Sequence, residues 1–400
     1  MTPPTDLPDI GAPKRLDAKA LQALLSLTAS EAIDTLRHQA CETTLARCGP
    51  AVYFRGLIEF SNICHRNCLY CGIRRDNNTV ARYQLSKADM VNQARWCADQ
   101  GFGSVVLQSG ERNDPPFVEF VIDAVRAIKK ATRSGRLPQG LGITLCVGEQ
   151  SRETYRRFFD AGAHRYLLRI ETSSPRLFKK WHPADQTYTN RRRCLEDLRS
   201  IGYQVGTGVM IGAPGQTPAD LAADVLFFKD LDVDMIGMGP YIPHHAAPLG
   251  RAKVLKPDQR FYLALRAIAV VRLALGGVNI AATTALQTLA PLGREMGLSF
   301  GANVIMPQVT PLTVRKGYTL YDNKPETNET DPAFQKALEM RILKMGRTIG
   351  RDGWGDSPHA KARGAGRYRT DCQAPYVAIE NPYSGGSEST VTVRKTSLSG

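Results

Sequence analysis

Three cysteines crowd into a short stretch of the chain, Cys64, Cys68 and Cys71, with the spacing C-x3-C-x2-C. Cysteine thiolates hold iron–sulfur clusters, normally four thiolates to one [4Fe–4S] cluster. Three clustered thiolates with no fourth partner nearby leave one iron open to a small ligand. A zinc knot is the alternative, but structural zinc sites take four protein ligands, usually in two pairs, and His65 points away from a cage shared with Cys64. The spacing therefore favours an iron–sulfur cluster with an open iron.

Polar and charged residues also follow later apolar runs. The stretch 108–111, Gln-Ser-Gly-Glu, follows one run, and a tight glycine turn alone does not explain its acid. Arg169 and Glu171 stand at alternating positions at the end of another run, so on a strand they share one face. Buried charges are costly unless they are paired or bind a charged ligand. These residues therefore predict a charged ligand beside the cysteine loop.

Alternating strand and helix patterns position these residues. Short apolar runs at eight places predict strands: 56–60, 104–107, 142–147, 166–170, 204–211, 235–241, 280–284 and 304–309. Helical patterns lie between most of them, at 87–100, 117–132, 152–161, 191–201, 219–231 and 258–275, with a shorter one at 286–298 that has Pro291 inside or beside it. Such alternation predicts a parallel sheet, and eight strands predict a complete (β/α)8 barrel of the TIM type. Barrel chemistry occurs at the carboxyl ends of the strands, where the cysteine loop follows the first strand.

The domain prediction places this barrel at residues 51–325. Helical periodicity over 14–50 predicts an N-terminal helical extension, residues 1–50. Residues 326–364 are expected to form a C-terminal helix, over 333–345, and an extension. Residues 365–400 are rich in Gly, Ser and Arg without apolar periodicity and are expected to be a flexible tail.

Composition limits the class of protein. Nine cysteines are an odd number, and the six outside the triad are scattered, which is not a secreted disulfide framework; we expect them to be small core residues. No apolar run is long enough to span a bilayer, and the first residues lack the features of a secretory signal, so we expect a cytoplasmic protein. The net charge is +14, but no nucleic-acid-binding motif accompanies it, which favours a solvated basic surface.

The cysteine loop resembles that of radical S-adenosylmethionine (SAM) enzymes, with Tyr70 as the aromatic residue before the last cysteine. Ser109, Gly110 and Glu111 resemble the Gly-Gly-Glu element that holds the SAM amino group. The resemblance implies that Arg169 or Arg191 takes the SAM carboxylate and that Glu171 takes a ribose hydroxyl or the amine. The glycine-rich stretch 206–217 resembles the strand beside the adenine. The implied cofactor-binding residues are Tyr70, Ser109, Gly110, Glu111, Thr144, Arg169, Glu171, Arg191 and Met210.

Residues of roughly 50–325 resemble the [FeFe]-hydrogenase maturase family HydE, in the biotin-synthase-like group, through stretches such as IEFSNICHRNCLYCGIRRDN, GAHRYLLRIETSSP and GREMGLSFGANVIMP. Methylornithine synthase, which isomerises lysine, shares the first motif and is the alternative. The pair Thr283 and Thr284 and the run that contains Met306 look more like the maturase, although ordinary barrel packing would also explain Met306. Other radical SAM enzymes acting on a small amino acid or a thiazolidine-like substrate stay open.

The maturase resemblance implies a mechanism and partners. An electron from the reduced [4Fe–4S] cluster cleaves SAM to methionine and a 5′-deoxyadenosyl radical. That radical acts on a cysteine-bound Fe(CO)2CN precursor supplied by HydG, and the product passes toward HydF; reduced ferredoxin or flavodoxin is the electron donor. The expected substrate-site residues are Gln108, Thr283, Thr284, Met306, Tyr318 and Tyr321. The region after Tyr321 lacks the cysteines that hold an accessory cluster in some family members, so no second cluster is expected.

Overall fold

Eight parallel strands close into a barrel in the computed structural model, which describes residues 16–325 and 327–364. The strand order runs β1-β2-β3-β4-β5-β7-β9-β10, and β10 pairs back onto β1. The prediction of a complete (β/α)8 barrel is confirmed. The barrel strands are β1 (Ala51–Ser61), β2 (Ser104–Ser109), β3 (Gly142–Cys146), β4 (Arg165–Leu167), β5 (Gln204–Thr207), β7 (Met235–Ile236), β9 (Asn279–Ala282) and β10 (Val304–Ile305). A short pair, β6 (Met210–Ile211) with β8 (Gly239–Pro240), follows β5 and β7.

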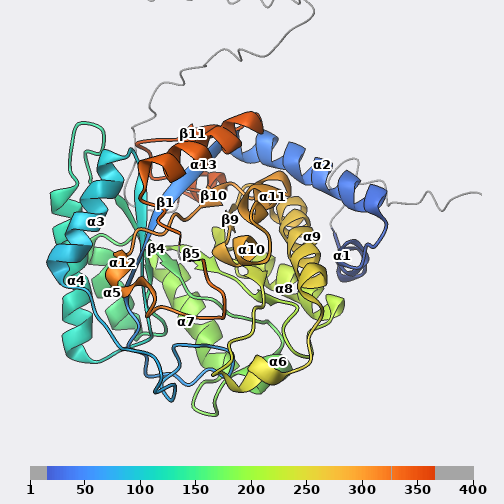
Figure 1. The fold of residues 1–400 in the computed structure, drawn as a ribbon, viewed down its shortest axis with the longest axis horizontal. Helices are drawn as coiled ribbons and strands as arrows, with labels where there is room; N and C mark the ends of the chain where they lie inside the picture. Colours follow the sequence, from blue (N-terminus) through green and yellow to red (C-terminus); the bar gives the residue numbers. More distant parts are fainter. Residues whose placement is uncertain (1–15, 326, 365–400) are drawn as a thin grey trace, which may run out of the picture. The chain divides into compact units, whose positions relative to one another are not determined.

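Helices surround the strands (Figure 1). Those that alternate with the strands are α3 (Lys87–Asp99), α4 (Pro115–Ala131), α5 (Arg152–Ala161), α7 (Tyr188–Ile201), α8 (Pro218–Asp230) and α9 (Pro257–Leu275). Local sequence sets their ends: Ser86 forms a capping box with Asp89 at the start of α3, and Gly162 takes a left-handed conformation at the end of α5. Further helices are α6 (Pro175–Trp181), η1 (Pro248–Arg251), α10 (Thr284–Leu289), α11 (Gly293–Ser299), α12 (Leu312–Arg315), α13 (Pro332–Lys344) and α14 (Pro358–Arg363).

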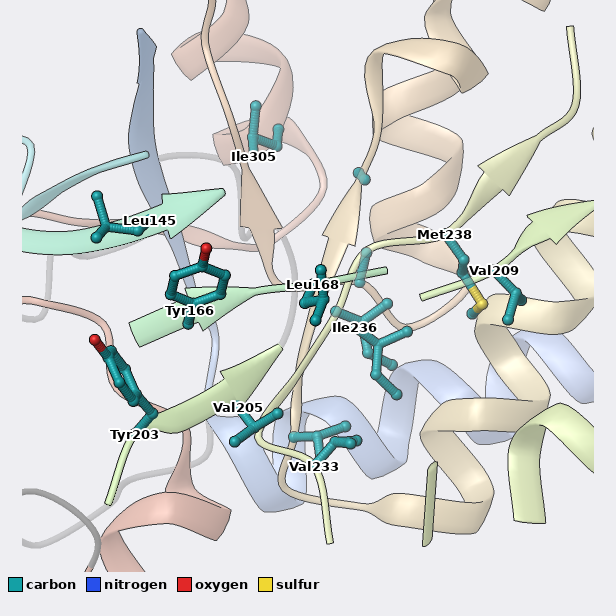
Figure 2. Packing of buried hydrophobic residues seen from close by; sticks show 14 of the residues in the cluster. Leu145, Tyr166, Leu168, Tyr203, Val205, Val209, Val233, Ile236, Met238 and Ile305 are labelled. Atoms are coloured by element: carbon teal, nitrogen blue, oxygen red, sulfur yellow. The ribbon is translucent and has the colours of Figure 1, made fainter. Parts of the chain in front are cut away.

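The hydrophobic core lies between the strands and the helices. Alternating strand residues such as Ile143 and Leu145 belong to it, which leaves Thr144 and Cys146 on the other face of β3, toward the barrel interior. Figure 2 shows Leu145 with other core side chains of the barrel strands. Val209 and Met238 pack with residues of α8 and α9. The strands therefore bury one face under helices and keep the other for the interior of the barrel.

Both ends of the described chain cover the barrel. Two helices, α1 (Ala18–Leu25) and α2 (Ser30–Cys48), pack against α8 and α9, in the range predicted to be a helical extension. A further strand, β11 (Thr348–Gly350), pairs with the first residues of β1, opposite to the end that carries the cysteine loop. The buried guanidinium of Arg55 donates to the carbonyl of Gly355 at 3.0 Å. Residues after 347 thus close the amino-terminal end of the barrel, although the sequence there shows no apolar period.

Several sequence expectations need correction. The fourth strand ends at Leu167, so Arg169 and Glu171 lie beyond it, and Glu171 has a φ of 65° instead of strand geometry. The helix expected over 286–298 is divided into α10 and α11, with Pro291 between them. The tail expected at 365–400 lies outside the described residues. Among the residues described, no helix combines the length and apolar character needed to cross a bilayer.

Candidate active site

The three cysteines of the triad converge in the loop that follows β1. Their thiols lie close enough that Cys71 and Cys64 both raise the pKa of Cys68, after burial, which raises it most. Burial likewise raises the pKa of Cys71 to about 12. A metal must therefore displace tightly held protons to bind here, and its positive charge is what makes the thiolates stable in this buried place. Backbone N–H groups of Arg66 and Glu111 each donate to Cys64 Sγ at 3.4 Å. Hydrogen bonds to the sulfur ligands of an iron–sulfur cluster help to set its reduction potential.

Gly110 lets the end of β2 approach the cysteine loop. Its N–H donates to the carbonyl of Ser61 at 2.8 Å. A Cβ atom at this position would overlap the carbonyl of Ile63 and would lie 2.8 Å from the Cβ of Cys64. Only a glycine fits between the two segments, because the loop backbone occupies the place of a side chain. Ser109, beside it, is buried, and its hydroxyl donates to the carbonyl of Gly110 at 2.7 Å.

Two arginines and two glutamates form a network against this loop. Glu111 pairs with Arg66 of the loop and lies 4.0 Å from Arg191 of α7. Glu149, which follows β3, lies 2.5 Å from Arg191 Nε and 3.3 Å from Arg66. Gly148 makes room for Glu111, since a Cβ at Gly148 would overlap its carboxylate. Burial raises the pKa of Glu111, while Arg191 and Arg66 lower it.

Arg169 and Glu171 form a second pair across the site. Arg169 Nη2 lies 3.1 Å from Glu171 Oε2, and Arg191 Nη1 donates to the Arg169 carbonyl at 2.5 Å. A bridge between Glu171 and Val209 fixes the backbone where β4 and β6 run past each other. The two residues therefore pair through a turn and not through the strand alternation that the sequence predicted.

Unpartnered polar atoms surround these pairs. In the described part of the chain, the buried atoms near the site that have no hydrogen-bond partner include Thr144 Oγ1, Arg169 Nε and Gln186 Nε2. Gln186 also accepts a hydrogen bond from Cys68 Sγ, at 3.2 Å, through its Oε1. Buried polar groups without partners cost free energy, so their presence indicates a ligand that completes them.

Tyr70 and Met210 lie in a small apolar cluster next to the cysteine loop, with Leu177, Trp181 and Tyr241. The Tyr70 hydroxyl lies 3.2 Å from His182 Nε2, and the two rings meet edge to face at 5.4 Å. The apolar character of this cluster suits contact with an aromatic group such as a nucleobase.

The expected substrate residues fall into two groups. Gln108, next to the last residue of β2, pairs with Cys146 of β3, and its side chain lies close enough to the buried Tyr318 hydroxyl to lower the pKa of Tyr318, which burial raises. The Thr283 hydroxyl donates to the Met238 carbonyl at 3.4 Å, and Thr284 begins α10. Tyr321 lies close to Thr288 of the same helix, which lowers the pKa of Tyr321 while burial raises it. Met306 directly follows β10 and is half-buried. Their role in binding substrate stays a prediction.

Sequence reasoning missed several residues of the site. Arg66, Glu149, Glu59, Lys324 and Cys146 all lie in it or beside it. Cys146 was expected to be an ordinary core cysteine, yet Arg169, Glu171, Arg191 and Glu111 all affect its pKa, which burial raises most. Their position along the chain could have indicated Glu149 and Cys146. Both stand at the carboxyl end of β3, where the active-site residues of such barrels lie.

The donor set fits the cofactors implied by the sequence. Three convergent thiols with backbone N–H donors suit a [4Fe–4S] cluster with one open iron. Three arginines and three glutamates in alternation around it suit a zwitterion, which carries an ammonium and a carboxylate. Such a ligand would also provide hydrogen-bond partners for Thr144 Oγ1 and Arg169 Nε, which have none in the described chain.

Comparisons with known proteins agree with this arrangement. Residues 58–228 match the Radical SAM superfamily. The [FeFe] hydrogenase maturase subunit HydE of Thermotoga maritima is 46% identical over 308 residues, which cover 77% of this chain and 84% of that protein. The 3-methylornithine synthase of Methanosarcina acetivorans is 25% identical over 329 residues, 82% of this chain and 88% of that protein. A crystal structure of methylornithine synthase, 23% identical, covers 85% of this chain and 95% of its own with a TM-score of 0.71, which supports the fold.

Proposed function

Because this chain belongs to the [FeFe]-hydrogenase maturase HydE family of radical SAM enzymes, we propose that it processes a cysteine-bound iron complex carrying two carbon monoxide ligands and one cyanide. It is a radical SAM enzyme with a role in hydrogenase maturation, and it uses a [4Fe–4S] cluster and SAM. When bound, the cluster supplies the electron that cleaves SAM to methionine and a 5′-deoxyadenosyl radical. The observation that carries the proposal is the 46% identity to the maturase subunit over most of both chains.

The residues around the triad have separate tasks in this proposal. Cys64, Cys68 and Cys71 hold the cluster. Glu111 binds the SAM ammonium and Arg191 or Arg169 its carboxylate, while Glu171 accepts from a ribose hydroxyl. Tyr70 and Met210 provide the apolar surface for the adenine, and Thr144 supplies a hydroxyl to the ligand.

The substrate lies deeper in the barrel interior in this proposal. Gln108 and Tyr318, whose side chains lie close together, face it from one side. Thr283, Thr284 and Tyr321 face it from the other, with Met306 below. Polar donors without net negative charge suit a small anionic iron complex. The closed barrel keeps water and oxygen from a radical formed there.

Partner proteins follow from the same proposal. HydG supplies the iron complex, HydF receives the product, and a reduced ferredoxin or flavodoxin donates the electron. Membership of the maturase family is what supports these partners.

The test begins with the cluster. The purified chain is reconstituted anaerobically with iron and sulfide, and iron content, absorbance and SAM cleavage are measured. Cys68→Ala should lose most of the iron and all SAM cleavage, whereas Cys97→Ala, which changes a buried cysteine on α3, should keep both. Equal iron content in the two variants would refute the assignment of the triad.

Substrate identity is tested by competition between two candidates. The reconstituted enzyme is given SAM, a reductant and either the cysteine-bound Fe(CO)2CN complex or lysine, the latter because 3-methylornithine synthase is the more distant relative. Faster formation of 5′-deoxyadenosine with the iron complex, together with its conversion, supports the proposal. Conversion of lysine with no response to the iron complex would replace it by the alternative.

A further inference from the structure

One buried glutamine contacts a cysteine of the triad directly. Cys68 Sγ donates to Gln186 Oε1 at 3.2 Å, and only 4% of Gln186 is exposed. The other end of the same amide, Gln186 Nε2, is buried as well and has no hydrogen-bond partner in the described chain. A buried donor without a partner lowers stability, so the amide is held in an unfavourable orientation while the thiol of Cys68 keeps its proton.

The turn that carries Gln186 is fixed beside the cysteine loop. It connects α6 to α7, and the Gln186 N–H closes it by donating to the carbonyl of Pro183 at 3.0 Å. The Leu69 N–H, next to Cys68, donates to the carbonyl of Trp181 at the end of α6, at 2.9 Å. Backbone contacts therefore hold the turn and the loop together, and the amide of Gln186 can rotate without leaving the sulfur.

The orientation of this amide suits a thiol and not a thiolate. A cysteine that ligates iron does so as a thiolate, which has no proton and only accepts hydrogen bonds. With Gln186 Oε1 toward the thiolate, two groups that only accept would face each other. Half a turn about the last side-chain bond exchanges Oε1 and Nε2, and such torsions rotate easily. The same rotation separates the two acceptors and gives Nε2 the partner that it lacks.

We propose that Gln186 is a positioning residue for the iron–sulfur cluster: when the cluster is bound, Gln186 Nε2 donates to Cys68 Sγ and raises the reduction potential of the cluster. The inference rests on the proposed role of the triad as cluster ligands. Reduction of [4Fe–4S]2+ to [4Fe–4S]+ takes one electron from an external reductant and adds negative charge to the cluster and its sulfur ligands. An N–H donor stabilises that added charge, so loss of the donor should make the cluster harder to reduce.

The contact at Cys68 differs from the contacts at Cys64. The donors to Cys64 Sγ are backbone N–H groups, which a substitution does not remove. The donor to Cys68 belongs to a side chain, so one substitution can remove it while the backbone keeps its place. Methionine has about the length of glutamine and offers no N–H, which makes Gln186→Met the suitable change.

The test measures the reduction potential of the cluster in two matched variants. Gln186→Met is compared with Gln335→Met, which makes the same change at a buried glutamine of α13 whose amide donates to the Glu329 carbonyl. Each full-length chain is reconstituted anaerobically and titrated with dithionite and redox mediators, and the reduced cluster is measured by its EPR signal. At equal solution potential, the ratio of reduced to oxidised cluster should fall about tenfold in Gln186→Met, which is about 59 mV for a one-electron couple. Gln335→Met should match the parent.

A second measurement needs no variant that folds. The parent chain is prepared with nitrogen-15 in the side-chain amides of its glutamines, and pulsed EPR of the reduced cluster should detect a coupling to that nitrogen. Gln335→Met should keep the coupling, and Gln186→Met should lose it. A loaded parent chain without the coupling, or an unchanged potential in Gln186→Met, would overturn the role of Gln186. A parent chain that binds no cluster would instead count against the proposed function.

Discussion

Lys324 Nζ lies 2.5 Å from Glu59 Oε1; the Glu59 side chain is buried, and that of Lys324 is only 11% exposed. The second oxygen of Glu59 accepts from Gln308 Nε2 at 2.5 Å, and the ammonium of Lys324 also donates to the carbonyl of Tyr318 at 3.0 Å. The pair joins the first strand to the segment that carries Tyr318. It therefore pins that segment over the interior of the barrel, beside Gln108.

Removing one partner of this pair should be costly. In Lys324→Met, Glu59 stays buried without its cation, and loss of one partner of a buried pair costs about 3–5 kcal/mol. The free energy of unfolding, measured by urea titration of the apo chain, should fall by that order.

The double variant Glu59→Gln with Lys324→Met is the control for this prediction. It removes both charges, so it should be more stable than Lys324→Met alone. If the single and double variants unfold at the same urea concentration, the pair does not hold the segment in place.

Gly110→Ala should disturb the cluster loop. Its Cβ would lie 2.8 Å from the Cβ of Cys64, so the loop must shift, and such overpacking costs about 1–3 kcal/mol. We expect lower iron content after reconstitution, measured per chain. Gly135→Ala is the matched control, since nothing lies within 4 Å of the added carbon. Equal iron content in the two variants would contradict the close approach of β2 to the loop.

Thr144→Val separates structural from ligand-binding roles for a buried hydroxyl. An unsatisfied buried polar group costs about 1–3 kcal/mol, so the valine variant should be more stable than the parent in the apo state. Its affinity for SAM should fall, by about tenfold if one hydrogen bond worth about 1.4 kcal/mol is lost. Calorimetry of the apo chain and a SAM-binding titration measure the two effects. Unchanged SAM affinity would show that the hydroxyl does not face the cofactor.

Asp224 of α8 should make stability depend on pH. Burial raises its pKa from 3.8 to about 7, although a hydrogen bond from the Ser173 N–H lowers it. The folded chain thus keeps a proton that the unfolded chain loses, so the contribution of Asp224 is full below about pH 4 and is lost as pH rises toward 7. The free energy of unfolding changes by about 1.4 kcal/mol for each pH unit that separates the folded pKa from the unfolded pKa.

The variant Asp224→Asn tests this dependence. It has no proton to lose, so its free energy of unfolding should fall less than that of the parent between pH 5 and pH 8. Urea titrations of both chains at the two pH values measure the difference. Parallel behaviour of the two chains would mean that Asp224 titrates normally.

Much of the fold could be read from periodicity. The helix at 152–161 has the predicted bounds, and the six long helices lie within a few residues of their predicted ranges. Strand ends were harder, because β4 stops at Leu167 while its apolar run continues to Ile170. Apolar residues that follow a strand can also pack against helices. Hydrophobicity alone therefore does not show where the hydrogen bonds between neighbouring strands, and with them the strand, end.

The sequence by itself determined the chemistry at the centre of the site. The C-x3-C-x2-C spacing and the order of strands and helices depend on residues that are near one another in the sequence, so both can be recognised without the structure. Only the tertiary structure decided which groups meet there. Glu59 and Lys324 stand 265 residues apart, and Arg66 reaches Glu149 from another strand end, so their pairing carries no period that a sequence could display. The same holds for residues 347–363. They close the barrel because buried residues of the strands bind them, and not because their own sequence has an apolar period.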